Sequence, residues 1–320
     1  MYWNRGCMQY LLIDFGASYI KTTIFDNETD TFTSQKYYES PFLKNNSISK
    51  QELMELLNTI VISNPSDGVV ICTILGGHYE DDVYYSWKSN KPPKKNECLI
   101  SGLFVESDNF HIHSHHKNFT SAEQYDDSLR VLGYINGIPV YSSLGDTYCV
   151  INSVDLQDDE VGINLGTGSQ VFYKNTVHMY IPSGRTFLAF QRMFQEFGFD
   201  MFSYMKTLTF EDIITSTLKV DLNIFSSAHK FIDGGKIELL TEQNMTKKNL
   251  VSSLIREYVI QYKPLIPSDT KRIYLLGGMS RKITNIQELF SYYYNVEVLT
   301  NNSSIENTHI GMSKLIKRYL

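Results

Sequence analysis

The sequence has little cysteine and no strong excess of either charge. Its four cysteines, Cys7, Cys72, Cys98 and Cys149, are irregularly spaced without a C-x-x-C pair, which argues against a disulfide framework or a structural zinc site. The 29 basic residues against 35 acidic ones give a formal net charge of −6. Because affinity for nucleic acid depends on clustered Lys and Arg, we expect no nucleic-acid partner.

Long apolar runs are also missing. The apolar run before Asp14 is too short for a signal peptide, and no window reaches the roughly 20 apolar residues that cross a bilayer. We therefore expect a soluble, cytoplasmic protein with no membrane partner. The 320 residues, 42% of them apolar, are enough for two domains with sizeable cores.

What the sequence does contain is a repeated theme, a buried strand that ends in a glycine-containing turn. Such turns occur at residues 14–18, 76–78, 166–168 and 277–278. Between them, Ser49 and Glu52 have the spacing of a helix-starting capping box, and helical periodicity occupies most of residues 185–262. We predict an α/β protein of two lobes, residues 1–144 and residues 145–320.

Two of these turns, Asp14-Phe-Gly-Ala-Ser18 and Asn164-Leu-Gly-Thr-Gly168, occupy corresponding points in the two predicted lobes. Glycine permits close approach to an anion, and the backbone N–H groups of such turns favour phosphate oxygens. Each turn could hold one side of a polyphosphate. Neither is a Walker loop, because no G-x-x-x-x-G-K-[ST] occurs. Ordinary hairpin-turn chemistry is the alternative for each turn.

The segment Leu12–Asp26, with its pattern D-x-G-x-[ST]-x-x-K, resembles the first phosphate motif of the actin, sugar-kinase and Hsp70 superfamily, and most closely that of the FGGY carbohydrate kinases. Leu144–Cys149 resembles the segment that carries their catalytic aspartate. Asn164–Val171 resembles their second phosphate motif, and Tyr274–Ser280 their adenosine motif. Tyr180–Ala189 is similar to the sedoheptulokinase branch, which makes a ketose the leading guess for the substrate.

The resemblance implies two ribonuclease-H-like lobes with a nucleotide cleft between them, and ATP and Mg²⁺ as cofactors. Asp146 would be the general base that accepts a proton from a sugar hydroxyl, and Asp14 would hold Mg²⁺. His78 and Thr147 would join Asp146 at the substrate. The remaining expected residues all lie at the nucleotide: Gly16, Ala17, Ser18, Lys21, Gly166, Thr167, Gly168, Gly277, Gly278 and Ser280.

Several of these residues also have a purely structural interpretation. Asp14 could simply end a strand, and Asp146 could be the N-cap of the following helix. The pair Gly277 and Gly278 is a common turn signal, and the register of His78 within its motif is open by one residue.

The sequence thus predicts ATP-dependent phosphorylation of a small sugar, ketose or polyol. The alternative is a non-catalytic nucleotide sensor or scaffold derived from such a kinase. Ala17, where the family commonly has threonine, and a short first lobe favour this alternative. A homodimer stays open as the assembly state.

Overall fold

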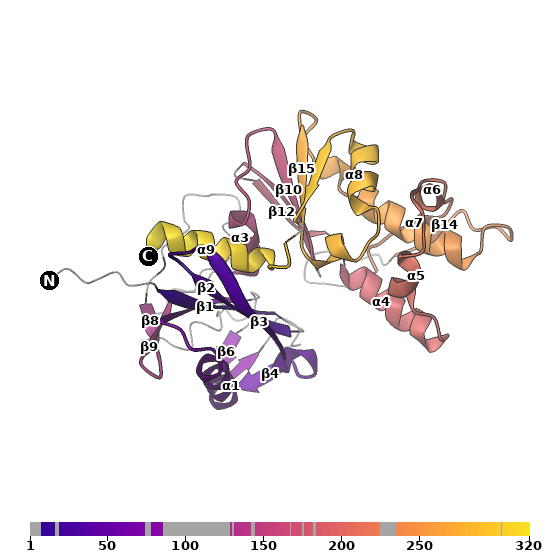
Figure 1. The fold of residues 1–320 in the computed structure, drawn as a ribbon. Coiled ribbons are helices and arrows are strands. Elements are labelled where there is room, and N and C mark those ends of the chain that lie inside the picture. The colour runs from indigo at the N-terminus through magenta and orange to yellow at the C-terminus, as the bar shows by residue number, and fades with distance from the viewer. Residues whose placement is uncertain are drawn as a thin grey trace. The chain divides into compact units, whose positions relative to one another are not determined.

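The computed structural model describes residues 8–16, 19–73, 78–85, 129, 131–141, 145–166, 168–174, 176–181, 184–224, 235–301 and 303–320. Its contacts divide the chain into two compact units (Figure 1). Unit 1 comprises Met1–Asp155 and Ser304–Leu320, and unit 2 comprises Leu156–Ser303. In the described part of the chain, no helix has both the length and the apolar character to span a bilayer.

Unit 1 is built on a six-stranded sheet in the order β3-β2-β1-β5-β9-β8. Strands β1, β2 and β3 form an antiparallel meander. Strand β5 then pairs in parallel with β1, and β9 pairs in parallel with β5. A smaller sheet has the order β4-β7-β6. The elements of unit 1 are β1 (Gln9–Phe15), β2 (Tyr19–Asp26), β3 (Thr31–Glu39), β4 (Ser47–Ser49), α1 (Lys50–Ile62), β5 (Gly68–Thr73), β6 (His78–Glu80), β7 (Val83–Tyr85), β8 (Val131–Ile135), β9 (Ile138–Tyr141), α3 (Asp146–Asn152) and α9 (Asn307–Tyr319), with a 3₁₀ turn η1 (Pro41–Leu43).

Alternation along β1 separates two cores on the two faces of this sheet. Leu11 and Ile13 belong to one core with Leu53 and Leu57 of α1. The predicted capping box at the start of α1 is confirmed, because the Ser49 hydroxyl accepts from the Glu52 N–H and the Glu52 carboxylate accepts from the Ser49 N–H.

The opposite face of the sheet carries Tyr10 and Leu12 and is covered by α9 through Met312 and Ile316. Asp14, two residues beyond Leu12, continues this second face at the end of the strand. The carboxylate of β1 therefore lies on the face of the sheet that the last helix of the chain covers.

Helix α9 belongs to unit 1 although unit 2 precedes it in sequence. It lies beside α3 (Figure 1), and a side chain at Gly311 would overlap the backbone carbonyl of Cys149. Glycine at this position is what lets the two helices approach so closely. The division therefore differs from the predicted one at residue 144, because α3 and α9 pack on each other and on β5 of unit 1.

Unit 2 repeats the pattern with a five-stranded sheet in the order β12-β11-β10-β15-β16. Strands β10, β11 and β12 are antiparallel, whereas β15 and β16 add in parallel. Its elements are β10 (Glu160–Leu165), β11 (Ser169–Tyr173), β12 (Thr176–Ile181), α4 (Gly184–Glu196), α5 (Met201–Met205), α6 (Phe210–Ile214), β13 (Lys219–Val220), β14 (Ile237–Glu238), α7 (Lys247–Ile260), β15 (Arg272–Leu276), α8 (Ile286–Tyr294) and β16 (Glu297–Thr300), with 3₁₀ turns η4 (Lys263–Leu265) and η5 (Gly278–Arg281).

The core of unit 2 joins its strands to α4, α7 and α8. Phe187 of α4 packs edge-on against Tyr258 of α7, and Tyr262 stacks on Phe290 of α8. The Tyr262 hydroxyl donates to Ser169 Oγ at 2.8 Å, so the polar end of this buried ring is satisfied. These contacts fix β11 and hence the turn that precedes it.

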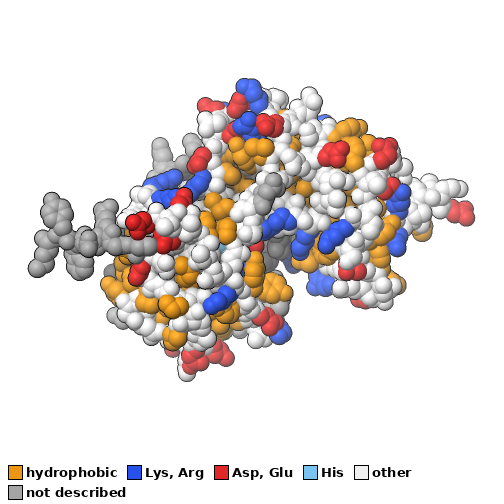
Figure 2. Space-filling view, in the orientation of Figure 1, with side chains coloured by type: hydrophobic (Ala, Val, Ile, Leu, Met, Phe, Trp, Pro, Cys, Tyr) orange, Lys and Arg blue, Asp and Glu red, His pale blue; other side chains and the backbone are white. Residues whose placement is uncertain are grey.

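Both units are mixed α/β layers with a meander followed by parallel strands, which confirms the predicted fold class. On the face of the molecule shown in Figure 2, Lys and Arg side chains are interspersed with Asp and Glu.

Candidate active site

A row of side chains crosses the sheet of unit 1 at the end of β1. Asp14 lies opposite Lys21 of β2 and opposite Cys72 of β5. Cross-strand partners point to the same face of a sheet, so all three lie on the face that α3 and α9 cover. The strand register, rather than closeness in sequence, brings this carboxylate, ammonium and thiol together.

Asp14 is a buried carboxylate whose oxygens are only partly satisfied. The Thr308 hydroxyl of α9 donates to Oδ2 at 3.0 Å, and the Lys21 ammonium lies 3.7 Å from the same oxygen. The Cys72 thiol lies 3.9 Å from Oδ1. A thiol is a weak donor, so Oδ1 retains most of its capacity to accept hydrogen bonds or a cation.

Lys21 lies between two carboxylates. Its Nζ is 3.3 Å from Glu306 Oε2 in addition to its contact with Asp14. Burial lowers the pKa of the Lys21 ammonium, but the charges of Asp14 and Glu306 outweigh this, and the net pKa is raised. Lys21 therefore stays charged at neutral pH, as a phosphate-binding lysine must.

His309 follows Thr308 and is also buried. Its Nε2 lies 3.3 Å from the carbonyl oxygen of Lys21, and a carbonyl only accepts, so Nε2 carries the proton. Burial lowers the pKa of this histidine. Its neutral ring ties α9 to the backbone of β2.

Asp146 is the first residue of α3, after the N-cap Gly145. The purely structural interpretation of Asp146 as the N-cap is thus wrong by one residue. Its Oδ1 accepts from the Thr147 N–H at 2.6 Å and from the Thr147 hydroxyl at 3.3 Å. Burial, reinforced by the negative charge of Asp14, raises the pKa of Asp146 to about 6.

The residues of this site fit a magnesium ion that is held by few protein carboxylates together with waters and substrate phosphates. The carboxylates of Asp14, Asp146 and Glu306 outnumber the single Lys21 ammonium, which leaves negative charge for a cation to balance. Across the described ranges, no group of three or more His, Cys, Asp or Glu side chains is arranged to hold a metal. Mg²⁺ does not need such a cage, because it is commonly held by one or two carboxylates, waters and substrate phosphates.

In unit 2 the predicted phosphate turn lies between β10 and β11. Asn164 Nδ2 donates to Gln170 Oε1 at 2.6 Å, and Gly184 N–H donates to the Gly166 carbonyl at 3.0 Å. A Cβ on Gly166 would lie 3.1 Å from the Gly168 carbonyl, whereas one on Gly168 would meet nothing within 4 Å. Gly166 is therefore constrained by its own turn, and Gly168 faces open space.

The second glycine pair follows β15 and repeats this contrast. Gly277 has φ = 83°, and a Cβ there would lie 2.5 Å from Asn164 Oδ1 and 2.8 Å from the Leu165 carbonyl. Only glycine fits such a position. Gly278 begins η5 and has open space around its Cβ position, and the Ser280 hydroxyl donates back to the Gly277 carbonyl at 2.7 Å.

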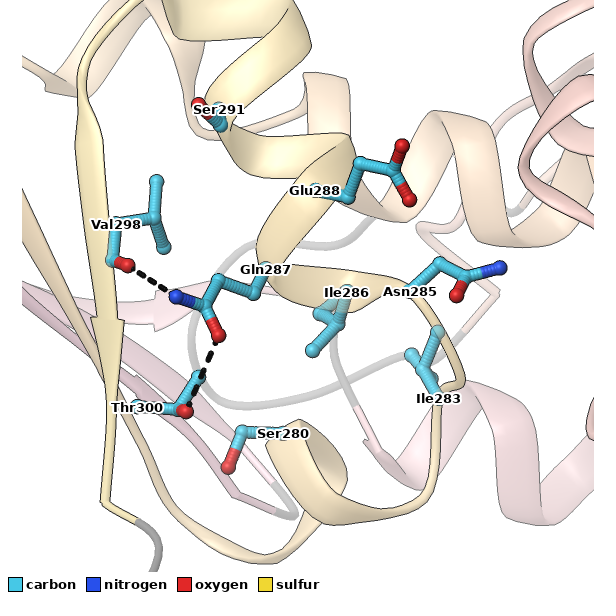
Figure 3. A pocket seen from close by; sticks show the side chains of 9 residues that line it. All are labelled: Ser280, Ile283, Asn285, Ile286, Gln287, Glu288, Ser291, Val298 and Thr300. Atoms are coloured by element: carbon cyan, nitrogen blue, oxygen red, sulfur yellow. Dashed lines mark hydrogen bonds between the residues drawn. The ribbon is translucent and has the colours of Figure 1, made fainter.

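A polar pocket of about 550 Å³ lies next to this turn, between η5, α8 and β16 (Figure 3). Gln287 crosses from α8 to β16, where its Nε2 donates to the Val298 carbonyl at 2.6 Å. Figure 3 shows Ser280 and Thr300 on one side of Gln287 and Asn285 on the other. The lining residues are Ser280, Ile283, Asn285, Ile286, Gln287, Glu288, Ser291, Val298 and Thr300.

The structure thus brings together Asp14, Lys21 and Asp146 in unit 1, and Gly166, Gly168 and Gly277 with its neighbours in unit 2. Gly16 closes the first turn, since its N–H donates to the Tyr19 carbonyl at 3.0 Å. Thr147, expected at the substrate, is buried against Asp146, and His78 begins β6 opposite Tyr85. Ala17, Ser18 and Thr167 lie outside the described residues. The substrate and nucleotide roles of these residues stay predictions.

Sequence reasoning missed three residues of this site, Glu306, Thr308 and His309. They lie almost 300 positions from Asp14 and Lys21 in sequence. No local pattern in the sequence links these three residues to β1 and β2, because the contacts depend on where α9 packs.

The fold has many relatives among solved structures. Gluconate kinase from Lactobacillus acidophilus aligns with a TM-score of 0.62 at 10% identity, over 98% of this chain and 89% of its own. Glycerol kinase from Plasmodium falciparum, solved with ADP, has a TM-score of 0.62 at 12% identity, over 97% and 89%. The chain has the fold of the carbohydrate kinases.

The same comparison extends beyond sugar kinases. The activator of 2-hydroxyisocaproyl-CoA dehydratase from Clostridium difficile, solved with ADPNP, aligns with a TM-score of 0.51 at 12% identity, over 97% of this chain and 92% of its own. No protein-family model and no curated protein matches the sequence. The predicted fold of the carbohydrate kinases is confirmed, and the nearness to the sedoheptulokinase branch stays a prediction.

Proposed function

We propose that the protein transfers the γ-phosphoryl group of Mg-ATP to a hydroxyl of a small sugar, ketose or polyol. The observation that carries this proposal is the pair Asp14 and Asp146. One carboxylate is suited to a cation beside a lysine, and the other has a pKa raised toward neutrality, on a fold shared with carbohydrate kinases. Phosphoryl transfer to an alcohol requires these two functions.

Asp146 is the proposed general base. With a pKa of about 6 it is mostly ionised at pH 7 and is more basic than an ordinary aspartate, which suits removal of a proton from a hydroxyl as the oxygen attacks phosphorus. The new P–O bond forms to the sugar oxygen, the bond to the ADP oxygen breaks, and Asp146 keeps the proton. Thr147 orients the carboxylate through its two donors.

Asp14 and Lys21 are the proposed ligands of the metal and the phosphates. Mg²⁺, when bound, would neutralise the charge that develops on the phosphate oxygens. Asp14 offers Oδ1 for the ion or for its water shell, and Lys21 supplies a permanent positive charge next to it.

Unit 2 contributes neutral groups in this proposal. The turn at Gly166–Gly168 would present backbone N–H groups to the terminal phosphates, and Gly277 with Gly278 would bring the backbone close to the nucleotide. The pocket of about 550 Å³ beside Ser280, lined by polar side chains and by Ile283, Ile286 and Val298, would hold the nucleoside in this proposal.

The substrate class comes from the structural relatives. They include gluconate, xylulose and glycerol kinases, so the proposed acceptor is a polyhydroxylated compound of small size. The sedoheptulokinase-like segment Tyr180–Ala189 puts ketoses first among the candidates.

The test is ADP release from Mg-ATP against a panel of ketoses, aldoses and polyols, with Asp146→Asn in parallel. We expect sugar-dependent release that falls by a factor of about 10²–10⁴ in Asp146→Asn. Asp155→Asn is the matched control, because Asp155 pairs with Lys314 on the surface of the same unit. ATP binding without sugar-dependent release would contradict the kinase.

That contradicting outcome would favour the second candidate, a non-catalytic nucleotide-binding sensor or scaffold. The fold shared with the dehydratase activator motivates it. A sensor would bind ATP in both the wild type and Asp146→Asn, with no sugar dependence in either.

A further inference from the structure

The two oxygens of Asp14 have different surroundings. Oδ2 receives the Thr308 hydroxyl at 3.0 Å and the Lys21 ammonium at 3.7 Å. Within the described ranges, the hydrogen bonds of Oδ1 are limited to the Cys72 thiol at 3.9 Å. The strong donors thus all approach one oxygen.

Two side chains at the start of α9, those of Thr308 and the N-cap residue Glu306, account for this difference between the two oxygens. Thr308 is buried, and its hydroxyl reaches down onto the sheet. Glu306 is the N-cap residue, yet its side chain makes no cap hydrogen bond to its own helix. Glutamate is a poor N-cap compared with Ser, Thr, Asp or Asn. Its carboxylate instead pairs with Lys21, which keeps the ammonium on the Oδ2 side of Asp14.

We propose that Thr308 is a positioning residue that turns the Asp14 carboxylate so that Oδ1 is presented to the metal of a bound metal-nucleotide. The proposal rests on the proposed function through the assignment of Asp14 to the metal. Thr308 itself touches neither substrate nor ion and acts through Asp14 alone.

The physical reason lies in the softness of the carboxylate torsion. The χ2 angle of aspartate is broad, so backbone geometry does not fix the plane of the carboxylate. The buried Thr308 hydroxyl at 3.0 Å restricts this freedom, because turning the carboxylate away would leave a buried donor unpaired. A carboxylate fixed in advance binds its cation without first losing rotational freedom.

The test uses the full chain and titrates it with ADP alone and with Mn²⁺-ADP, followed by calorimetry and by the electron paramagnetic resonance signal of free Mn²⁺. Thr308→Val keeps the shape and removes the hydroxyl, and Thr308→Ser keeps the hydroxyl. The matched control is Ser313→Ala, which removes a buried hydroxyl of the same helix that donates to Ile310.

We expect Thr308→Val to weaken Mn²⁺-ADP binding by about 10- to 100-fold, the usual effect of losing a residue that orients a metal ligand. Binding of ADP without metal should change less than about threefold, and Thr308→Ser and Ser313→Ala should resemble the wild type. If Thr308→Val does not fold, as judged by its Tm and circular dichroism, Thr308→Ala takes its place.

Equal affinity of Thr308→Val and the wild type for Mn²⁺-ADP would overturn the proposal. So would an equal loss of affinity with and without metal, because that result belongs to a merely structural role. Failure of the kinase proposal is a separate outcome. If the wild type phosphorylates no sugar but Thr308→Val still loses affinity for Mn²⁺-ADP and not for ADP alone, the positioning role of Thr308 is supported. A wild type that binds no Mn²⁺-ADP overturns both proposals.

Discussion

Five strands of unit 1, in the order β3-β2-β1-β5-β9, correspond to the five strands of unit 2, but different residues stand at the end of the first strand of each unit. Unit 1 has Asp14-Phe-Gly at the end of β1, and unit 2 has Asn164-Leu-Gly at the end of β10. The cross-strand partner is Lys21 in the first case and Gln170 in the second. One carboxylate–ammonium pair thus corresponds to one amide–amide pair.

The two units therefore offer different kinds of groups, charged in unit 1 and neutral in unit 2. Unit 1 concentrates ionisable groups near the end of β1: burial and the charge of Asp14 raise the pKa of Asp146, and the carboxylates of Asp14 and Glu306 raise the pKa of Lys21. Unit 2 offers neutral glycine turns, in which Asn164 supports the backbone through Gln170. In the proposed function, the groups of unit 1 would balance the charge of the cation and the phosphates, and the turns of unit 2 would bring backbone N–H groups close to phosphate oxygens.

The largest expected effect comes from making the two units alike. Asp14→Asn turns the charged row of unit 1 into an amide like that of unit 2. We expect sugar-dependent ADP release to fall by about 100-fold or more, because the carboxylate for the cation is lost. Steady-state kinetics at varied Mg²⁺ measures this effect. Activity within threefold of the wild type would contradict the assignment of the metal to Asp14.

A second prediction concerns the helix pair found in unit 1. Gly311→Ala puts a methyl group into the Cys149 carbonyl, so α9 must move away from α3. We expect a loss of about 1–3 kcal/mol or more in the free energy of unfolding, as for other overpacked contacts. Urea unfolding measures it, with Gly168→Ala as a control whose Cβ has open space. An unchanged midpoint would show that the helices are farther apart than in this structure.

A third prediction separates glycines that serve the fold from glycines that serve a ligand. Gly168→Ala and Gly278→Ala meet no atom within 4 Å, so stability should be unchanged. ATP affinity should fall by about tenfold, or 1.4 kcal/mol, if the nucleotide lies against these atoms. Gly277→Ala, with its positive φ and close contacts, should instead unfold unit 2. Calorimetry with ATP and thermal unfolding distinguish these cases, and unaltered ATP affinity would remove both turns from the nucleotide site.

The smallest effect concerns Asp146 and pH in the absence of Mg²⁺. Its pKa is raised from 3.8 to about 6 in the folded protein, so the folded state binds the proton more tightly than the unfolded state. The free energy of unfolding should therefore decrease as pH rises from about 4 to about 6 and level off above that, by about 1–3 kcal/mol.

Asp146→Asn removes the ionisation and should abolish this slope. It should therefore make the protein more stable than the wild type at pH 7 while it lowers activity. Urea unfolding at several pH values checks this prediction. Parallel curves for the two proteins would show that Asp146 is not perturbed.

Much of the fold was predictable because its signals are local. Alternation along residues 10–15, the capping box at Ser49 and the glycine turns after the buried strands are short-range patterns with direct physical causes. The lobe boundary was harder to predict, because α3 and α9 are assigned by packing on unit 1 and not by any break in the sequence at residue 144.

The candidate site likewise contains residues that the sequence predicted and residues that it did not. Asp14, Lys21, Asp146 and the glycines carry motifs that a sequence displays, because their residue types and spacing follow from one turn or one strand. The contacts of Thr308, Glu306 and His309 were not predictable, because each depends on where the last helix docks.

The sequence by itself therefore determined the elements and the residues that can do chemistry, since strands, turns and caps depend on neighbours within a few positions. The tertiary structure alone decided which of these residues meet. Docking of α9 through Gly311 puts a hydroxyl and a carboxylate onto Asp14 and Lys21, and burial near Asp14 raises the pKa of Asp146. Such effects depend on distance and on exclusion of water, which only the folded chain sets.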